Sequence, residues 1–108
     1  MQTLFLLIAA HALADFAFQS EAMALGKNRH VQPTVADSRG FPGWPYWLTA
    51  HALIHGGAVA LVTGVWWLGL AETVLHWLVD YAKCEDWIGF DTDQGVHIAS
   101  KILWWVLI

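Results

Sequence analysis

Histidine and acidic side chains recur at four-residue steps along segments of the chain that are otherwise apolar. Nine residues make up these steps: His11, Asp15, His51, His55, Glu72, His76, Asp80, Asp93 and His97. Four residues is close to one helical turn, so the members of each step lie on one face of a helix. Imidazole and carboxylate groups on facing helices are the usual ligands of a metal site inside a bundle. The spacing therefore predicts one shared metal site.

The charge of this set also favours a bound cation. Its carboxylates are matched by a single lysine within the same apolar segments, Lys101. A carboxylate in a low-dielectric interior either takes up a proton or pairs with a cation, so we expect one or two divalent metal ions. Histidine with carboxylate suits Zn²⁺ first, with Mn²⁺ or iron as alternatives. The expected metal ligands are His11, Asp15, His51, His55, His76, Asp80 and His97.

Glu72 and Asp80 bear on the number of ions. Their positions in the sequence place them about 12 Å apart along a helix axis, too far to bind one ion together easily. The site then holds two ions, or one ion with one of these carboxylates orienting a histidine. A two-ion centre suits hydrolysis by a bridging water.

The remaining ionisable residues are expected to act on a substrate. Glu72 or Asp93 is the expected general base. Lys101 or Lys83 is expected to hold an anionic group of the substrate. Lys101 has a second interpretation as an internal counter-ion of Asp93, because the two lie on one face of the same predicted helix.

Other polar residues receive smaller roles. Gln19 and Gln94 are expected to hydrogen-bond within the site or to cap it. Lys27 and Arg29 are expected to set the orientation of the chain in a membrane, and not to belong to the site. Cys84 is the single cysteine, so it cannot form an internal disulfide, and we expect it to be inert.

The composition predicts a membrane protein of one domain. The chain has 108 residues, of which 57% are hydrophobic and 13% charged, whereas soluble domains are about 25% charged. Eight tryptophans fit a protein at a bilayer interface. A net charge of −4 without a basic stripe excludes a nucleic-acid partner. The expected class is an all-α, polytopic membrane four-helix bundle.

Apolar runs and their breaks give the expected helices. These are residues 2–25, 46–64, 67–84 and 92–108, with a polar loop at 26–45. Gly64 or Gly69 is expected to form the short turn between the second and third helices, and Thr92 is expected to cap the fourth.

The loops and helix depths predict an orientation and a place for the site. Lysine and arginine in the first and third connections, including Arg39 and Lys83, point to the cytoplasm, so both termini are expected on the other side. Depths along the predicted helices put most of the ionisable residues in one slab near the cytoplasmic face.

Four motifs carry a resemblance to a known family. They are HALADFAFQSEAMALGK at 11–27, HALIH at 51–55, ETVLHWLVDYAK at 72–83 and DQGVH at 93–97. In this order they resemble a family of small bacterial and phage integral membrane proteins that is known as a domain of unknown function. The resemblance implies a small helical domain in the bacterial inner membrane. A looser resemblance to membrane-bound metal-dependent hydrolases rests on residue types alone and favours hydrolysis.

Three functions follow as expectations. The first is a metal-dependent hydrolase of a lipid-like or phosphoester substrate in the bilayer. The second is a transporter or channel subunit for protons or divalent metal, because Asp, Glu and His also form relays. The third is a structural subunit that binds haem or a pigment, although axial ligation by histidine needs no carboxylates. A small bundle would shield its site poorly, so we expect a homo-oligomer.

Overall fold

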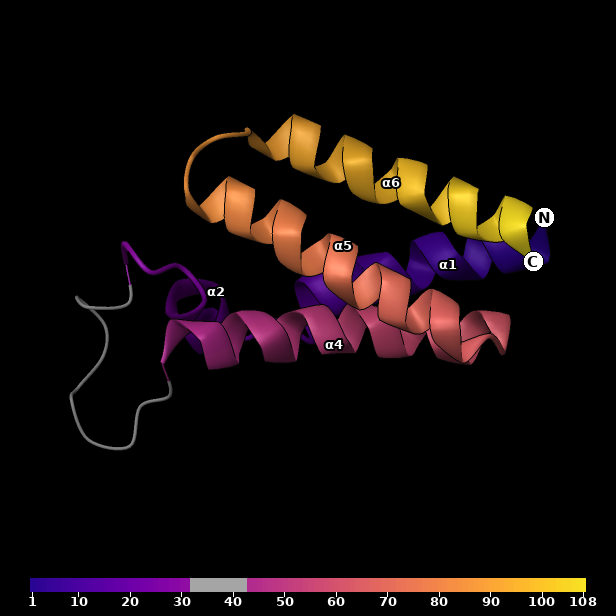
Figure 1. Cartoon of the computed structure of the whole chain (residues 1–108), viewed down its shortest axis with the longest axis horizontal. Coiled ribbons are helices and arrows are strands. Elements are labelled where there is room, and N and C mark those ends of the chain that lie inside the picture. Colours follow the sequence, from indigo (N-terminus) through magenta and orange to yellow (C-terminus); the bar gives the residue numbers. More distant parts are fainter. Residues whose placement is uncertain (32–42) are drawn as a thin grey trace.

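Helices are the regular elements of the part of the chain that the computed structural model describes, residues 1–31 and 43–108 (Figure 1). They are α1 (Gln2–Ala12), the π-helical turn η1 (Leu13–Ala17), α2 (Glu21–Gly26), α4 (Trp44–Thr63), α5 (Trp66–Cys84) and α6 (Phe90–Leu107). The predicted all-α class is confirmed for these residues.

The first helical segment is broken, so the prediction of one helix over 2–25 is wrong. After η1 the helix ends near Phe18, and α2 starts again with Ser20 at its N-cap. The Ser20 hydroxyl accepts a hydrogen bond from the Met23 amide at 3.1 Å. A short polar side chain stabilises a helix start in this way better than a helix interior. The Gln19 side chain donates to the Asp15 carbonyl at 3.1 Å and satisfies part of the broken end.

α4 and α5 form an antiparallel hairpin with a very short turn (Figure 1). Pro45 lies in the first turn of α4, where its missing N–H removes no helical hydrogen bond. Gly64 ends α4 with φ of 72°, a left-handed conformation that glycine adopts without steric cost. Of the two glycines considered for this turn, Gly64 is therefore the one that forms it. The Val65 amide then donates to the Thr63 hydroxyl at 3.1 Å.

The two helices of this hairpin cross closely at a pair of glycines. A Cβ atom added at Gly56 would lie 1.8 Å from the Thr73 hydroxyl oxygen and 2.5 Å from the Gly69 carbonyl oxygen. A Cβ added at Gly69 would lie 2.7 Å from the Gly56 carbonyl oxygen. The contact brings α4 and α5 near enough for their histidines to meet.

We expect Gly56→Ala to destabilise the protein by about 1–3 kcal/mol, because the added methyl group overpacks this crossing. Gly57→Ala is the matched control, since a Cβ there meets nothing within 4 Å. That change should stabilise the helix by about 0.5–1 kcal/mol. Urea unfolding of both variants measures the difference. Equal stability of the two variants would show that the helices do not cross this closely.

A Schellman-type turn ends α5 and leads into α6. The Trp87 amide donates to the Ala82 carbonyl at 3.0 Å, and the Asp86 amide donates to the Lys83 carbonyl at 2.9 Å. Asp86 has φ of 66°, as the residue after the helix cap does in this motif. α6 then begins at Phe90 behind Gly89.

The prediction of Thr92 as the cap of α6 is therefore wrong. Asp91 and Asp93 lie in the first turn of the helix. Negative charge there is favoured by the helix dipole, which supports a start before Thr92.

The helices on either side of the predicted loop at 26–45 extend slightly into it. Gly26 closes α2, and α4 begins at Trp44. The part of this loop at 32–42, which includes Arg39, lies outside the described residues. Before that gap, both Arg29 and His30 bond the Glu85 carboxylate, with His30 Nε2 at 2.9 Å. Arg29 thus ties the chain after α2 to the end of α5.

The interior of the bundle divides into an apolar end and a polar middle. Leu7, Val59, Leu68 and Trp104 form a buried apolar cluster. Both chain termini lie at the same end of the molecule (Figure 1). Away from this cluster, the buried positions of α1, α4, α5 and α6 include five histidines and three carboxylates, beside Leu48 and Ala52 of α4. The four helices thus enclose a polar site.

The prediction of a multi-pass protein in the bacterial inner membrane, with both termini on the non-cytoplasmic side, is wrong. Within the described ranges, no helix combines the length and the apolar character that crossing a bilayer requires. α1 has only 11 residues before the π-turn, whereas a spanning helix needs about 20. α5 and α6 are longer but carry ionisable residues on every turn or two of their inner faces.

Candidate metal centre

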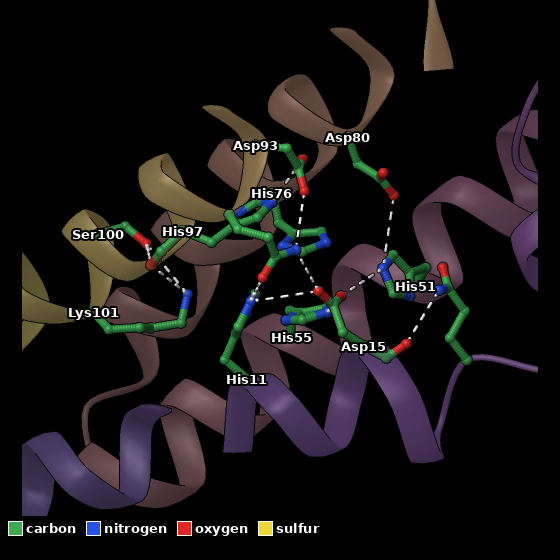
Figure 2. A network of polar contacts seen from close by, with 12 residues as sticks. His11, Asp15, His51, His55, His76, Asp80, Asp93, His97, Ser100 and Lys101 are labelled. Atoms are coloured by element: carbon green, nitrogen blue, oxygen red, sulfur yellow. Dashed lines mark hydrogen bonds and ion pairs between the residues drawn. The ribbon is translucent and has the colours of Figure 1, made fainter. Parts of the chain in front are cut away.

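Asp15 lies where the polar side chains of the bundle meet (Figure 2). Its Oδ1 accepts a hydrogen bond from His55 Nε2 at 2.9 Å and lies 3.5 Å from His51 Nε2. Its Oδ2 accepts from Gln94 Nε2 at 3.0 Å and lies 3.4 Å from His11 Nε2. Asp15 belongs to η1. A single π-turn changes the direction of a side chain relative to an α-helix and often occurs at functional sites.

Four side chains from three elements form a candidate ligand group. They are Asp15, His51, His55 and His76, and one ligand atom from each lies within 4.8 Å of the ligand atoms of the others. The three histidines are each 1% exposed. η1, α4 and α5 supply these residues, and the four-residue steps noted in the sequence place them on the inner faces.

Two distances in this group are close to those between neighbouring ligands of a tetrahedral ion. Zn²⁺ bonded to N and O at 2.0–2.1 Å implies distances of about 3.3 Å between neighbouring ligand atoms. Asp15 Oδ1 lies 2.9 Å from His55 Nε2 and 3.5 Å from His51 Nε2. Both nitrogens of His76 are buried without a hydrogen-bond partner. A buried polar atom without a partner is uncommon, and a metal ion would satisfy one of these nitrogens.

The protonation states of the group suit a cation. Burial lowers the pKa of His76 to about 2 and that of His55 to about 4, so both rings are neutral at pH 7 and keep a lone pair. Burial alone would raise the pKa of Asp15, but hydrogen bonds from His51, His55 and Gln94 hold it well below its usual range. Asp15, His55 and His76 therefore offer an ionised carboxylate and two neutral imidazoles, the forms that bind metal.

His76 lies in a stack of three imidazole rings. Its centroid is 3.6 Å from that of His55 and 4.2 Å from that of His97. The planes in these two pairs differ by 16° and 19°. The stack fixes the orientation of His76 and joins the ligand group to α6.

A second group with ligand-like spacing consists of Glu72, His76 and His97. Its carboxylate is already occupied, because Glu72 Oε1 accepts from Lys101 Nζ at 2.6 Å and Oε2 accepts from Trp104 Nε1 at 2.6 Å. Burial would raise the pKa of Glu72, but His76 and Lys101 lower it to about 2. The Lys101 ammonium beside this carboxylate would repel a second cation, so the geometry favours one ion.

Lys101 is therefore not the counter-ion of Asp93, as one interpretation of the sequence had it. Its side chain extends from α6 toward α5 and pairs with Glu72, and both side chains are at most 1% exposed. Asp93 lies 3.9 Å from Lys83 Nζ and 3.3 Å from His97 Nε2. Residues on one face of a helix are near each other, but a long lysine can reach a partner on the next helix.

The other predicted ligands surround the group without belonging to it. Asp80 Oδ2 accepts from Lys27 Nζ at 2.7 Å and lies 3.6 Å from His51 Nε2, a position that orients the His51 ring. His11 Nε2 hydrogen-bonds Gln94 Oε1 at 3.1 Å. His97 stacks on His76. In the structure these three residues therefore lie next to the group of Asp15, His51, His55 and His76, outside its four members.

A cavity of about 60 Å³ opens beside the ligand group. Its lining residues are Asp15, Phe16, Gln19, Lys27, His76, Asp80, Lys83, Phe90, Asp93, Gln94 and His97. Because Asp15 and His76 belong to both, an ion in the group would be reached from this cavity. The volume is enough for at least one water molecule.

Lys27 is the site residue that sequence reasoning missed. It was expected to orient the chain, but it is 7% exposed, bonds Asp80 and lines the cavity. The acidic excess among the buried positions was the one signal that a further cation had to enter the site.

Cys84 gives a prediction about pH. Burial, followed by the charge of Asp80, raises the pKa of its thiol to about 11. Between pH 8 and this value the folded protein should therefore react with iodoacetamide far more slowly than the urea-unfolded chain, whose thiol has a pKa of about 8.5. Mass spectrometry of timed samples at pH 9 measures both rates. Equal rates would contradict the burial of this thiol.

A family model described as "Protein of unknown function (DUF3307)" matches residues 3–108, nearly the whole chain. The resemblance to a domain of unknown function is thereby confirmed, whereas a similarity to hydrolases is not shown. Neither a curated protein nor a solved structure matches the chain.

Proposed function

We propose that this chain, which belongs to the DUF3307 family, holds one divalent metal ion and uses it to hydrolyse an ester bond. The observation that supports this most is the ligand group of Asp15, His51, His55 and His76, which is joined to a polar cavity. A buried ion with no access would have a structural role only. An ion beside a cavity can meet a substrate.

The ligand types favour Zn²⁺. Nitrogen and carboxylate oxygen in tetrahedral arrangement suit zinc, while Mn²⁺ and iron take more oxygen ligands or more positions. Four protein ligands fill a tetrahedron, so a substrate oxygen would reach the ion only as a fifth ligand, and at that position the ion would act as a Lewis acid. The three imidazoles hold the ion, and Asp15 balances one of its charges.

The cavity wall supplies the proton acceptor. Asp93 lines the cavity, and its buried Oδ1 lies 3.3 Å from His97 Nε2. Burial would raise the pKa of Asp93, but the hydrogen bond with His97 lowers it, so the carboxylate is ionised and can accept a proton. Glu72, the other expected base, has both oxygens bonded to Lys101, Ser100 and Trp104. The geometry thus supports Asp93 as the general base.

The proposed step balances as a hydrolysis. A water in the cavity gives its oxygen to the acyl or phosphoryl centre, and Asp93 accepts the proton that this water loses. The bond to the leaving oxygen breaks, and that oxygen takes up the proton that Asp93 had accepted. Asp15, His51, His55 and His76 keep the ion in place throughout.

The test combines metal content with turnover. Purified protein is stripped with chelator, reloaded separately with Zn²⁺, Mn²⁺ or Fe²⁺, and assayed on p-nitrophenyl acetate and p-nitrophenyl phosphate. We expect about one equivalent of zinc and hydrolysis that chelator abolishes. Asp93→Asn should keep the zinc and lose most of the activity, by 10²-fold or more as is usual for a general base. Less than about half an equivalent of any metal, or loaded protein that cleaves neither ester, would overturn the proposal.

A further inference from the structure

Two lysine ammonium groups border the cavity beside the metal centre. Lys27 Nζ donates to Asp80 at 2.7 Å but has three N–H donors in all. Lys83 Nζ lies 3.9 Å from Asp93 Oδ2, which is too far for a hydrogen bond. It also lies 5.4 Å from the centre of the Phe90 ring. Both lysines therefore have donors to offer to a molecule in the cavity.

The charge of the cavity depends on the ion. Its lining includes three carboxylates, Asp15, Asp80 and Asp93, and two ammonium groups, Lys27 and Lys83. These three carboxylates and two ammonium groups sum to one negative charge, which repels an anion. A divalent cation in the ligand group reverses this to one positive charge. The low dielectric of a buried site makes such a change effective.

We infer that the cavity of the metal-loaded protein binds a phosphate group, with Lys83 and Lys27 donating to its oxygens. The inference rests on the proposed function and names the substrate class as a phosphoester. Lysine is a usual point-charge partner of phosphate. The metal ion beside Asp15 and His76 would contact the same phosphate group. The cavity, at about 60 Å³, admits a small tetrahedral anion.

An unpartnered side chain at the same place supports a ligand there independently of the lysines. His76 lines the cavity, is 1% exposed and has no hydrogen-bond partner for either nitrogen. A metal ion satisfies one nitrogen, and the second remains available to the cavity or to Glu72, whose Oε1 is 3.7 Å from Nδ1.

Calorimetric titration of inorganic phosphate tests the inference. Zinc-loaded wild-type protein should bind phosphate at least tenfold more tightly than metal-free protein, because the charge of the cavity changes sign. Lys83→Gln should weaken binding to the zinc form about tenfold or more, as expected for losing a hydrogen bond between charged groups. Arg29→Gln is the control, since Arg29 pairs with Glu85 and does not line the cavity.

Turnover separates substrate binding from loss of structure. Lys83→Gln should lower kcat/KM for p-nitrophenyl phosphate about tenfold or more. Arg29→Gln, whose side chain pairs with Glu85 outside the cavity, should leave kcat/KM for both esters within about twofold of the wild type. Lys27→Arg keeps the charge and should retain phosphate binding.

The outcomes distinguish this inference from the proposed function. Protein that takes up zinc and cleaves the acetate ester, but binds no phosphate or binds it equally well in Lys83→Gln, contradicts the inference alone. Protein that takes up no metal contradicts the proposed function itself.

Discussion

Replacing His76 with phenylalanine should lower zinc affinity by more than about 100-fold. Changing a residue that merely orients a ligand costs about 10–100-fold, and removing a ligand should cost more. His76 belongs to the ligand group of Asp15, His51 and His55. Phenylalanine keeps an aromatic ring between His55 and His97 but has no lone pair.

Competition with a chromogenic zinc chelator measures this affinity. His30→Phe is the matched control, because His30 is bonded to Glu85 on the surface and is remote from the ligand group. That variant should bind zinc as the wild-type protein does. Circular dichroism in the absence of metal shows whether both variants fold. A folded His76→Phe protein with unchanged zinc affinity would remove His76 from the site.

Replacing Lys101 with methionine should destabilise the metal-free protein by about 3–5 kcal/mol, the usual effect of removing one partner of a buried ion pair. Glu72 is 0% exposed, and Lys101 Nζ is 2.6 Å from its Oε1. Without this ammonium group, the carboxylate keeps neutral donors only, from Ser100 and Trp104. Methionine has a similar length, so the loss of charge dominates over the loss of volume.

The double variant Glu72→Gln/Lys101→Met isolates the electrostatic part. With no buried charge left unpaired, it should recover most of the lost stability. Urea unfolding without metal measures the wild type, both single variants and the double variant. A Lys101→Met protein within about 1 kcal/mol of the wild type would show that Lys101 and Glu72 do not form this pair.

The sequence was sufficient to predict the helical class and the inward faces of the helices. The step from His51 to His55 and the position of His76 placed these imidazoles on the inner faces of α4 and α5. Helical periodicity alone determines which residues share a face. It was therefore enough to bring these histidines together once the helices packed.

The environment of Asp15 and the partner of Lys101 could not be predicted. Asp15 depends on a π-turn and on the restart of the chain at Ser20, which are local changes that a four-residue step does not encode. Lys101 finds Glu72 on another helix, and the relative rotation of two helices depends on side-chain packing. The close crossing at Gly56 and Gly69 sets the placement of α5 against α4 but not against α6.

The membrane prediction was wrong because it rested on the total apolar content of the chain. The spacing of ionisable residues that predicted the site also lowers the mean hydropathy of the helices that carry it. Glu72, His76 and Asp80 all lie within α5, and Asp93, His97 and Lys101 within α6. The overall composition gives the apolar content of the whole chain. It does not show that the ionisable residues are concentrated in individual helices and lower the hydropathy of those helices.

Anomalous X-ray diffraction at the zinc absorption edge, from crystals of the zinc-loaded protein, tests the metal centre most directly. We predict one strong peak at about 2.0–2.1 Å from ring nitrogens of His51, His55 and His76, with Asp15 Oδ1 completing the tetrahedron. Crystals that contain zinc but show no peak among these side chains would contradict the account. So would a dominant peak beside Glu72 and His97.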